Sequence, residues 1–144
     1  MLFRSDLAGN PLAGPVVDQW WRTVDTVAPN ANIVDIDPDP RITSVGNVTI
    51  LFDEDVTGVD ITSFTLTKDP GSGAVPVIGF QNLPVTEVTP SEYTLNLSTV
   101  TDVDAVYTLT LLADPLVPKI FDVANNALFV SVSDIWTRNE ADDA

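Results

Sequence analysis

Cysteine and histidine are both absent from this chain of 144 residues. Their absence excludes thiolate zinc sites, cysteine nucleophiles, Ser-His-Asp triads and histidine general bases. Basic residues are scarce as well, with 6 lysines and arginines against 21 acidic residues and a net charge of −15. Nucleic acids and anionic lipid surfaces bind basic patches, and no apolar run reaches the length of a membrane span. The sequence therefore predicts no nucleic-acid partner and no membrane insertion.

Hydrophobic residues make up 44% of the chain, enough for a folded core without metal or disulfides. In several short stretches they alternate with polar residues, and this period of two predicts half-buried strands. The apolar positions of these stretches are Val48, Ile50 and Phe52; Phe64 and Leu66; Tyr93, Leu95 and Leu97; and Tyr107, Leu109 and Leu111. Further strands are predicted over residues 32–37, 75–80 and about 127–137, the second weakened by Pro76 if it is central in a sheet. Seven or eight short strands without an amphipathic helix predict an all-β antiparallel sandwich.

Tyr107 stands at the start of the penultimate predicted strand. Immunoglobulin-type sandwiches often place a corner tyrosine there, with its hydroxyl bonded back to the backbone. A plain core tyrosine is an equally good interpretation of the same position.

One stretch of the sequence occurs twice, at residues 6–20 and 122–136. Aligned without a gap at an offset of 116 residues, the two copies share seven of fifteen positions. The identical pairs are Asp6/Asp122, Ala8/Ala124, Asn10/Asn126, Leu12/Leu128, Val16/Val132, Asp18/Asp134 and Trp20/Trp136. A fixed offset marks a repeat, and its length is that of one sandwich. We therefore expect an N-terminal strand segment over residues 1–24, a sandwich domain over 25–138 and an acidic tail over 139–144.

The N-terminal segment carries four apolar side chains in an extended stretch, Val16, Val17, Trp20 and Trp21. A lone strand does not fold, so these residues are predicted to lie in an interface. The segment could be the last strand of a preceding unit in a longer chain, a donor strand for a neighbouring copy, or a cap on an edge of its own domain. The first two arrangements both predict head-to-tail association, which need not close and can extend into a fibre or lattice.

Four segments follow a familiar order, namely DTVAP at 25–29, VTILFDEDV at 48–56, YTLTL at 107–111 and DVANNAL at 122–128. With this order the chain resembles the bacterial immunoglobulin-like repeats of very large secreted or cell-surface proteins. The end motif of that family is Asp-x-Ala-Gly-Asn-x-Leu, which residues 6–12 match fully, whereas the second copy has Asn125 in place of glycine. Asparagine tolerates the left-handed conformation, so the turn is expected to survive. The resemblance implies a Greek-key immunoglobulin-like sandwich, an extracellular location, tandem arrays, adhesion or scaffold roles, and often Ca²⁺ at or near the joints. It does not imply catalysis.

Acidic clusters are the remaining candidates for chemistry. They are Asp35, Asp37 and Asp39; Asp53, Glu54 and Asp55; Asp102 and Asp104; and Asp6 or Asp122 with Asn10 or Asn126. Ca²⁺ takes six to eight oxygen ligands from carboxylates, amides and carbonyls. Residues 25–29 are predicted to form a hinge between units, because Pro29 biases Ala28 towards extended geometry. The favoured calcium site is Asp122 and Asn126 with the hinge residue Asp25, and the competing interpretation is a solvated acidic surface. A glycoside hydrolase would need two carboxylates in a cleft, and a sandwich of this size without insertions offers little cleft.

The sequence thus predicts a structural protein and not an enzyme, namely a self-associating extracellular repeat that builds a fibre, lattice or tandem surface array. The alternative is an adhesin or a carbohydrate-binding sandwich. A glycan partner would require an exposed aromatic row, for which Trp20, Trp21 and Trp136 are the candidates, or a Ca²⁺-supported sugar site. Packing is favoured for the tryptophans, because Trp20 and Trp136 hold equivalent strand positions and aromatic residues dominate core and interface burial.

Overall fold

The structure is a computed structural model that describes residues 25–114 and 116–140. The four predicted interface residues of the N-terminal segment therefore lie outside the described residues. Within the described ranges the chain forms ten strands and two short 3-10 helices. The strands are β1 Ala31–Ile33, β2 Asn47–Phe52, β3 Val56–Thr57, β4 Phe64–Asp69, β5 Val75–Pro76, β6 Val85–Thr89, β7 Glu92–Asn96, β8 Ala105–Leu111, β9 Phe121–Asp122 and β10 Val132–Arg138, and the helices are η1 Ile61–Ser63 and η2 Phe80–Asn82.

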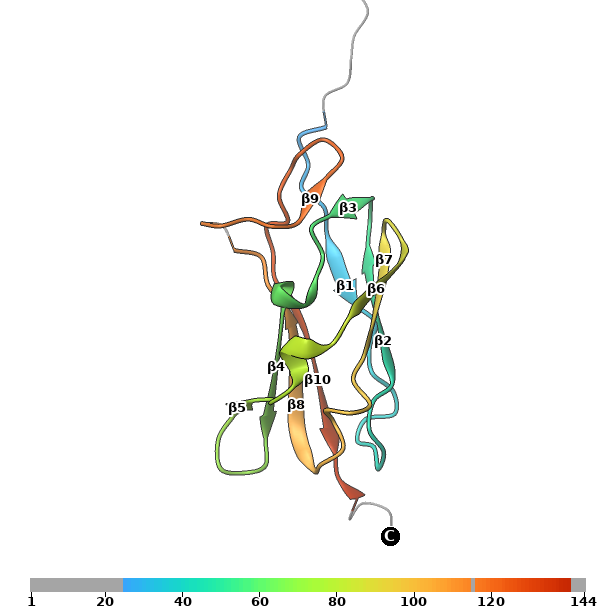
Figure 1. Cartoon of the computed structure of the whole chain (residues 1–144), viewed down its shortest axis with the longest axis vertical. Helices are drawn as coiled ribbons and strands as arrows, with labels where there is room; N and C mark the ends of the chain where they lie inside the picture. The colour runs from blue at the N-terminus through green and yellow to red at the C-terminus, as the bar shows by residue number, and fades with distance from the viewer. Residues whose placement is uncertain (1–24, 115, 141–144) are drawn as a thin grey trace, which may run out of the picture.

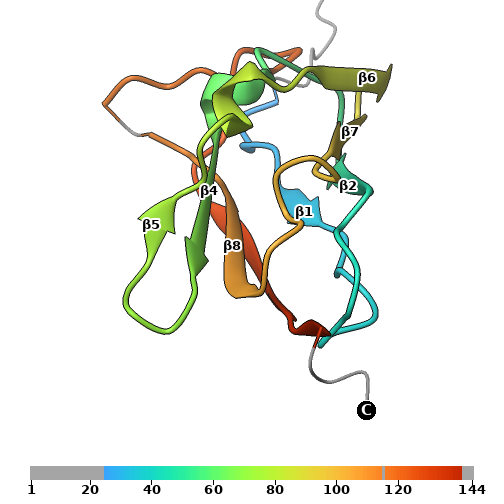
Figure 2. The ribbon, with the colours of Figure 1, turned by 60° about the horizontal axis from the view of Figure 1, so that its bottom comes forward.

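Two four-stranded sheets face each other and form a sandwich (Figure 1). One sheet has the order β1-β2-β7-β6 and the other the order β10-β8-β4-β5, and all of these strand pairs are antiparallel. In Figure 2, β4, β5 and β8 lie on one side of the molecule and β1, β2 and β7 on the other. The short antiparallel pair β3–β9 stands at one end of the sandwich. The predicted all-β antiparallel sandwich is confirmed.

The core lies between the two sheets and is built from the predicted alternation. In β2 the side chains of Val48, Ile50 and Phe52 are buried, whereas Asn47 and Leu51 are exposed. The apolar positions predicted for β4, β7 and β8 are buried in the same way. Successive side chains of a strand point to opposite faces, so each strand gives every second residue to the core.

Tyr107 and Trp136 are the largest of the fully buried side chains, and they lie opposite each other on β8 and β10. The Tyr107 hydroxyl donates to the backbone carbonyl of Val103, four residues upstream, at 2.8 Å. Tyr107 is thus a core residue whose hydroxyl bonds back to the backbone.

The first strand is shorter than predicted, because β1 ends at Ile33 and does not run to residue 37. The turn that follows contains Pro38 and Pro40, which have no N–H group to donate to a strand ladder. Just before this turn, the N–H of Ile36 donates to the Asp134 carboxylate at 3.1 Å and not to a neighbouring strand. The segment therefore leaves the sheet before the prolines.

The predictions for β5 and β10 were also too long. β5 has only the two residues Val75–Pro76, at the sheet edge where a proline is tolerated, and Gly79 with φ 88° then leads the chain into η2. β10 begins at Val132 and not near residue 127, because the N–H of Leu128 donates to the Ile120 carbonyl at 2.8 Å beside β9. Local hydrogen bonds at the strand ends therefore set these limits.

Three strands, β3, β6 and β9, were not predicted. β3 and β9 have two residues each and pair with each other, although about 65 positions separate them in the chain. β6 is an edge strand whose residues are mostly exposed, so it lacks the alternation that marks a half-buried strand.

The two ends of the described chain lie at opposite ends of the sandwich. Figure 1 shows the chain entering beside β9 at one end of the long axis and leaving beyond β10 at the other. We call these the entry end and the exit end. Among the described residues there is no helix with the length and hydrophobicity to cross a membrane.

Candidate functional site

Three carboxylates meet at the entry end of the sandwich. They belong to Asp25, Glu54 and Asp122, and one oxygen from each lies within 4.8 Å of the others. Over residues 25–114 and 116–140, this is the one group of three acidic side chains placed so closely. The three residues lie in the N-terminal hinge, the β2–β3 turn and β9, so only the folded chain brings them together.

Asp122 is fixed by the turn that follows it. Its Oδ1 accepts the backbone N–H of Asn126 at 2.8 Å, and its Oδ2 accepts Nδ2 of the same residue at 2.9 Å. Within this turn Asn125 has φ 73°, in the left-handed region. The turn expected to survive the replacement of glycine by asparagine is therefore formed. Asp122 is only 4% exposed, so its carboxylate enters the cluster in one orientation.

Asn126 also connects the cluster to the start of the described chain. Besides holding Asp122, its Nδ2 donates to the backbone carbonyl of Asp25 at 3.0 Å. The Asp25 side chain in turn accepts the N–H of Val27 at 2.9 Å, which closes a small turn at the hinge. These bonds place the Asp25 carboxylate beside that of Asp122.

The β2–β3 turn is fastened to the same hinge through Asn30 and Asp53. The backbone N–H and the Nδ2 of Asn30 each donate to an Asp53 carboxylate oxygen at 2.9 Å. The backbone and side-chain hydrogen bonds from Asn30 hold the pKa of Asp53 below its usual value. Because Glu54 is the next residue, this contact brings it towards the hinge and the cluster.

The pKa values of Glu54 and Asp122 are shifted in opposite directions. Burial raises the pKa of Glu54, and the negative charges of Asp122 and Asp25 raise it further. Burial also acts to raise the pKa of Asp122, but the hydrogen bonds from Asn126 outweigh it and the pKa is lowered. Asp122 is therefore the stable anion of the cluster, and Glu54 is the carboxyl group whose ionisation its neighbours oppose.

The predicted set Asp25, Asp122 and Asn126 is brought together by the fold, and Glu54 is added to it. The sequence analysis grouped Glu54 with Asp53 and Asp55 and missed its place here, because the approach of the β2–β3 turn to β9 is a long-range contact. Asp6 and Asn10 lie outside the described residues, and some carboxylates of the other acidic clusters have structural partners. For example, the Asp39 carboxylate accepts the N–H of Thr137, and Asp104 forms an ion pair with Arg138.

The donor set of the cluster is suited to a hard divalent cation. All its ligand atoms are oxygens from three carboxylates, with the Asn126 amide beside them, and Ca²⁺ prefers oxygen ligands of this kind. A bound cation would offset the mutual repulsion that opposes the ionisation of Glu54.

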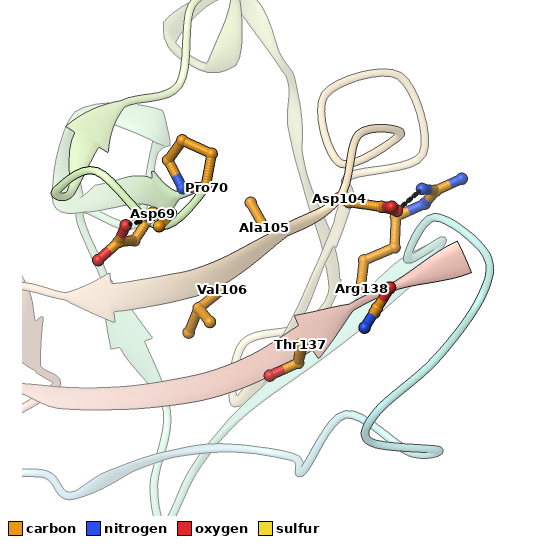
Figure 3. Close-up of a pocket in the computed structure, with 9 residues that line it drawn as sticks. Asp69, Pro70, Asp104, Ala105, Val106, Thr137 and Arg138 are labelled. Carbon is orange, nitrogen blue, oxygen red and sulfur yellow. Dashed lines mark hydrogen bonds and ion pairs between the residues drawn. The ribbon is translucent and has the colours of Figure 1, made fainter. Parts of the chain in front are cut away.

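A hollow of about 380 Å³ lies at the exit end, between the β4–β5 turn, the start of β8 and the end of β10 (Figure 3). The Arg138 guanidinium at its side is paired with the carboxylates of Asp104 and Glu140. Its positive charge is therefore already balanced, and we assign no ligand to this hollow.

Trp136 does not serve as a sugar-stacking residue. It is 1% exposed and its ring stacks on Tyr107 inside the core, as the packing interpretation predicted. Trp20 and Trp21, the other two candidates for an aromatic platform, lie outside the described residues.

The fold defines the class of the protein as an all-β sandwich of two antiparallel sheets. Comparison of the chain with protein-family models gives no match, and comparison with curated proteins gives none either.

Proposed function

We propose that the chain is a structural repeat unit, an immunoglobulin-like sandwich that associates head to tail in an extracellular fibre, lattice or tandem array. The observation that carries this proposal is the duplication of one strand. Residues 16–22 repeat Val132–Arg138 at the offset of 116, with identical residues at four of the seven positions. The described sandwich has one strand position for this sequence, beside β8, and β10 occupies it. The surplus copy therefore belongs with a neighbouring unit.

The strand order supports the immunoglobulin-like part of the proposal. If the eight strands of the two large sheets are lettered along the chain, with β5 as C′, the sheets read A-B-E-D and G-F-C-C′. Immunoglobulin sandwiches have the sheets A-B-E-D and C-F-G. The hydrogen bond from Tyr107 to the Val103 carbonyl, at the start of strand F, is that of a tyrosine corner.

The C-terminal part of the outer edge of β10 is already occupied, which argues against pairing of the N-terminal segment along the whole of this edge. The N–H of Arg41 donates to the Thr137 carbonyl at 2.9 Å, and the N–H of Asn139 donates to the Arg41 carbonyl at 2.8 Å. The N–H of Thr137 is taken by the Asp39 carboxylate at 2.9 Å. A second copy of the strand therefore has no free ladder at the last residues of β10, which favours pairing with another unit.

The position of the chain ends also favours a linear arrangement. Because the chain enters the sandwich at one end and leaves at the other, successive units can follow one another along the long axis (Figure 1). A head-to-tail contact of this type uses two different surfaces and extends without closing.

We include Ca²⁺ in the proposal as a stabiliser of the entry end. Asp25, Glu54 and Asp122 would hold it through their carboxylates, and Asn126 through its amide oxygen after rotation of the amide group. When bound, the cation would neutralise the charge of the cluster and tie the hinge to the β2–β3 turn and to β9.

The decisive experiment compares the size of the full chain with that of a chain that starts at Asp25, by light scattering and negative-stain microscopy. The shorter chain keeps every buried core residue from Ile33 to Trp136 and should stay folded. We expect filaments or oligomers from the full chain only, and weaker assembly when a chelator removes Ca²⁺. Monomers of both chains at every concentration tested would remove self-association and leave only a covalent tandem arrangement.

A further inference from the structure

Exposed apolar side chains are concentrated at the entry end of the sandwich. Five apolar residues in the described ranges are more than 70% exposed, and four of them lie between residues 116 and 129. These four are Leu116 at 89%, Val117 at 71%, Val123 at 84% and Phe129 at 73%, and Val130 follows at 58%. We call these five residues the apolar loop surface. Exposed apolar residues gathered in this way mark interaction surfaces more often than isolated ones do.

The residues of this surface lie on two loops that are hydrogen-bonded to each other. The N–H of Ala113 donates to the Ser131 hydroxyl at 2.7 Å, at one end of both loops. The N–H of Leu128 donates to the Ile120 carbonyl at 2.8 Å, at the other end. The two loops therefore have fixed ends, and the segments between them project from the sandwich near β9 (Figure 1).

The N-terminal segment joins the domain beside these loops. Asn126, in the turn that follows Val123, donates its Nδ2 to the Asp25 carbonyl at 3.0 Å. Trp21 precedes Asp25 by four residues, which span at most about 14 Å when extended. Trp21 is therefore within reach of the turn that carries Val123, which is part of the apolar loop surface.

We propose that the apolar loop surface is the docking site for the N-terminal segment of the same chain, with Trp21 as its anchor. This inference rests on the proposed function in one respect, the assignment of residues 16–22 as the last strand of a preceding unit. In that strand Trp20 takes the position of the buried Trp136 and is committed to the core of its own unit. Trp21 takes the position of Thr137 on the opposite face of the strand and is available for the following unit.

The apolar loop surface and the N-terminal segment are both apolar and nearly uncharged. The five residues of the apolar loop surface carry no charge in a chain of net charge −15, so the surface selects an uncharged, apolar partner. The segment from Val16 to Trp21 contains four large apolar side chains and a single acidic residue, Asp18. Burying a tryptophan against such a surface restricts the hinge, which turns a flexible joint into a stiff one.

Trypsin cleavage after Arg22, followed by mass spectrometry, tests the docking in the full chain. We define the protection of this bond as the rate of cleavage after Arg22 in a synthetic peptide of residues 1–27, divided by the rate at the same bond in the full chain. We expect Phe129→Ser to lower this protection about tenfold, since cleavage of a docked segment requires local opening. Ile78→Ser is the matched control, because Ile78 is 93% exposed and lies outside the apolar loop surface. Slow cleavage after Arg41 and Lys68 verifies that each variant remains folded.

The anchor is tested with Trp21→Ala and Trp20→Ala, each compared with a peptide that carries the same substitution. We expect Trp21→Ala to remove the protection and Trp20→Ala to retain it. The inference is overturned by equal cleavage of peptide and protein, by equal effects of Phe129→Ser and Ile78→Ser, or by protection that depends on protein concentration. Protection of Arg22 that appears only at concentrations where the chain assembles would leave the proposed function standing without this docking site. Protection in a chain that stays monomeric would support the docking and count against self-association.

Discussion

Tyr107 and Trp136 stack in the core with ring centroids 5.5 Å apart and ring planes inclined by 13°. They are opposite residues of the adjacent strands β8 and β10, and both are almost fully buried. The stack therefore joins the last strand of the domain to its neighbour through side chains as well as through backbone hydrogen bonds. Because Trp20 repeats Trp136, we expect the same relationship inside a preceding unit whose last strand is residues 16–22.

Substitution Tyr107→Phe should destabilise the domain by about 1–2 kcal/mol, because it removes the hydroxyl that bonds the Val103 carbonyl and keeps the stacked ring. Equilibrium unfolding in denaturant measures the change. Trp136→Ala should destabilise the domain more, by about 3–5 kcal/mol, because it removes one of the two stacked rings and leaves a cavity in the core. An unchanged midpoint for Tyr107→Phe would mean that the tyrosine acts through its ring alone.

Substitution Gly58→Ala should destabilise the domain by at least about 2 kcal/mol. Gly58 has φ +86°, and a Cβ atom there would lie 2.0 Å from the Lys119 carbonyl oxygen. Backbone atoms cannot move aside as a flexible side chain can. Gly46→Ala is the control, because a Cβ atom at that position meets nothing within 4 Å. Thermal unfolding of the two variants should separate them clearly, and equal melting temperatures would contradict this account.

Substitution Glu54→Gln should stabilise the protein at neutral pH when no divalent cation is present. The pKa of Glu54 is raised in the folded state, so the folded protein binds its proton more tightly than the unfolded chain does. The contribution of this group to stability is therefore favourable at low pH and is lost as the pH rises from the usual value, 4.5, through the raised one. Melting curves from acid to neutral pH should show the variant gaining over the wild type across this interval. Glu140→Gln, at the exit end, should show no such gain.

Substitution of Asn126 tests the same cluster through its uncharged member, the Asn126 amide. Asn126→Ala removes the two hydrogen bonds that the Nδ2 group donates, one to Asp122 Oδ2 and one to the Asp25 carbonyl, and the hinge should loosen. If the cluster binds Ca²⁺, the ion should raise the melting temperature of the wild type and have little effect on this variant. Calorimetric titration with Ca²⁺ gives the same comparison directly. A calcium effect that is equal in both proteins would place the ion elsewhere.

Substitution Asn125→Gly should stabilise the β9 turn by about 0.5–1 kcal/mol, because glycine adopts a positive φ without the cost of a Cβ atom. The change restores the residue that the first copy of the motif has at Gly9. The midpoint of chemical unfolding measures it. A loss of stability would indicate that the Asn125 side chain makes contacts that outweigh its backbone strain.

The core of the sandwich followed from the sequence because burial acts on every second residue of a strand. The alternation around Ile50, Leu95 and Leu109 is a local pattern, and the structure buries all three completely. The turn after Asp122 was also predicted from a local pattern. It requires a residue in the left-handed conformation within four positions of Asp122, and asparagine tolerates that conformation. Three of the four residues in the oxygen cluster were predicted from the repeated motif and the hinge that precedes the domain.

What only the tertiary structure decided depends on contacts between distant segments. Glu54 reaches Asp122 because Asn30 holds the β2–β3 turn against the hinge, and no local pattern records that contact. The strands β3 and β9 are two residues long and exist only as partners of each other. The exposure of Phe129 also depends on the long-range hydrogen bond from Ala113 to Ser131, which holds one end of its loop. Local patterns in the sequence therefore specify which residues are buried, whereas the packing of the two sheets specifies which surface residues meet.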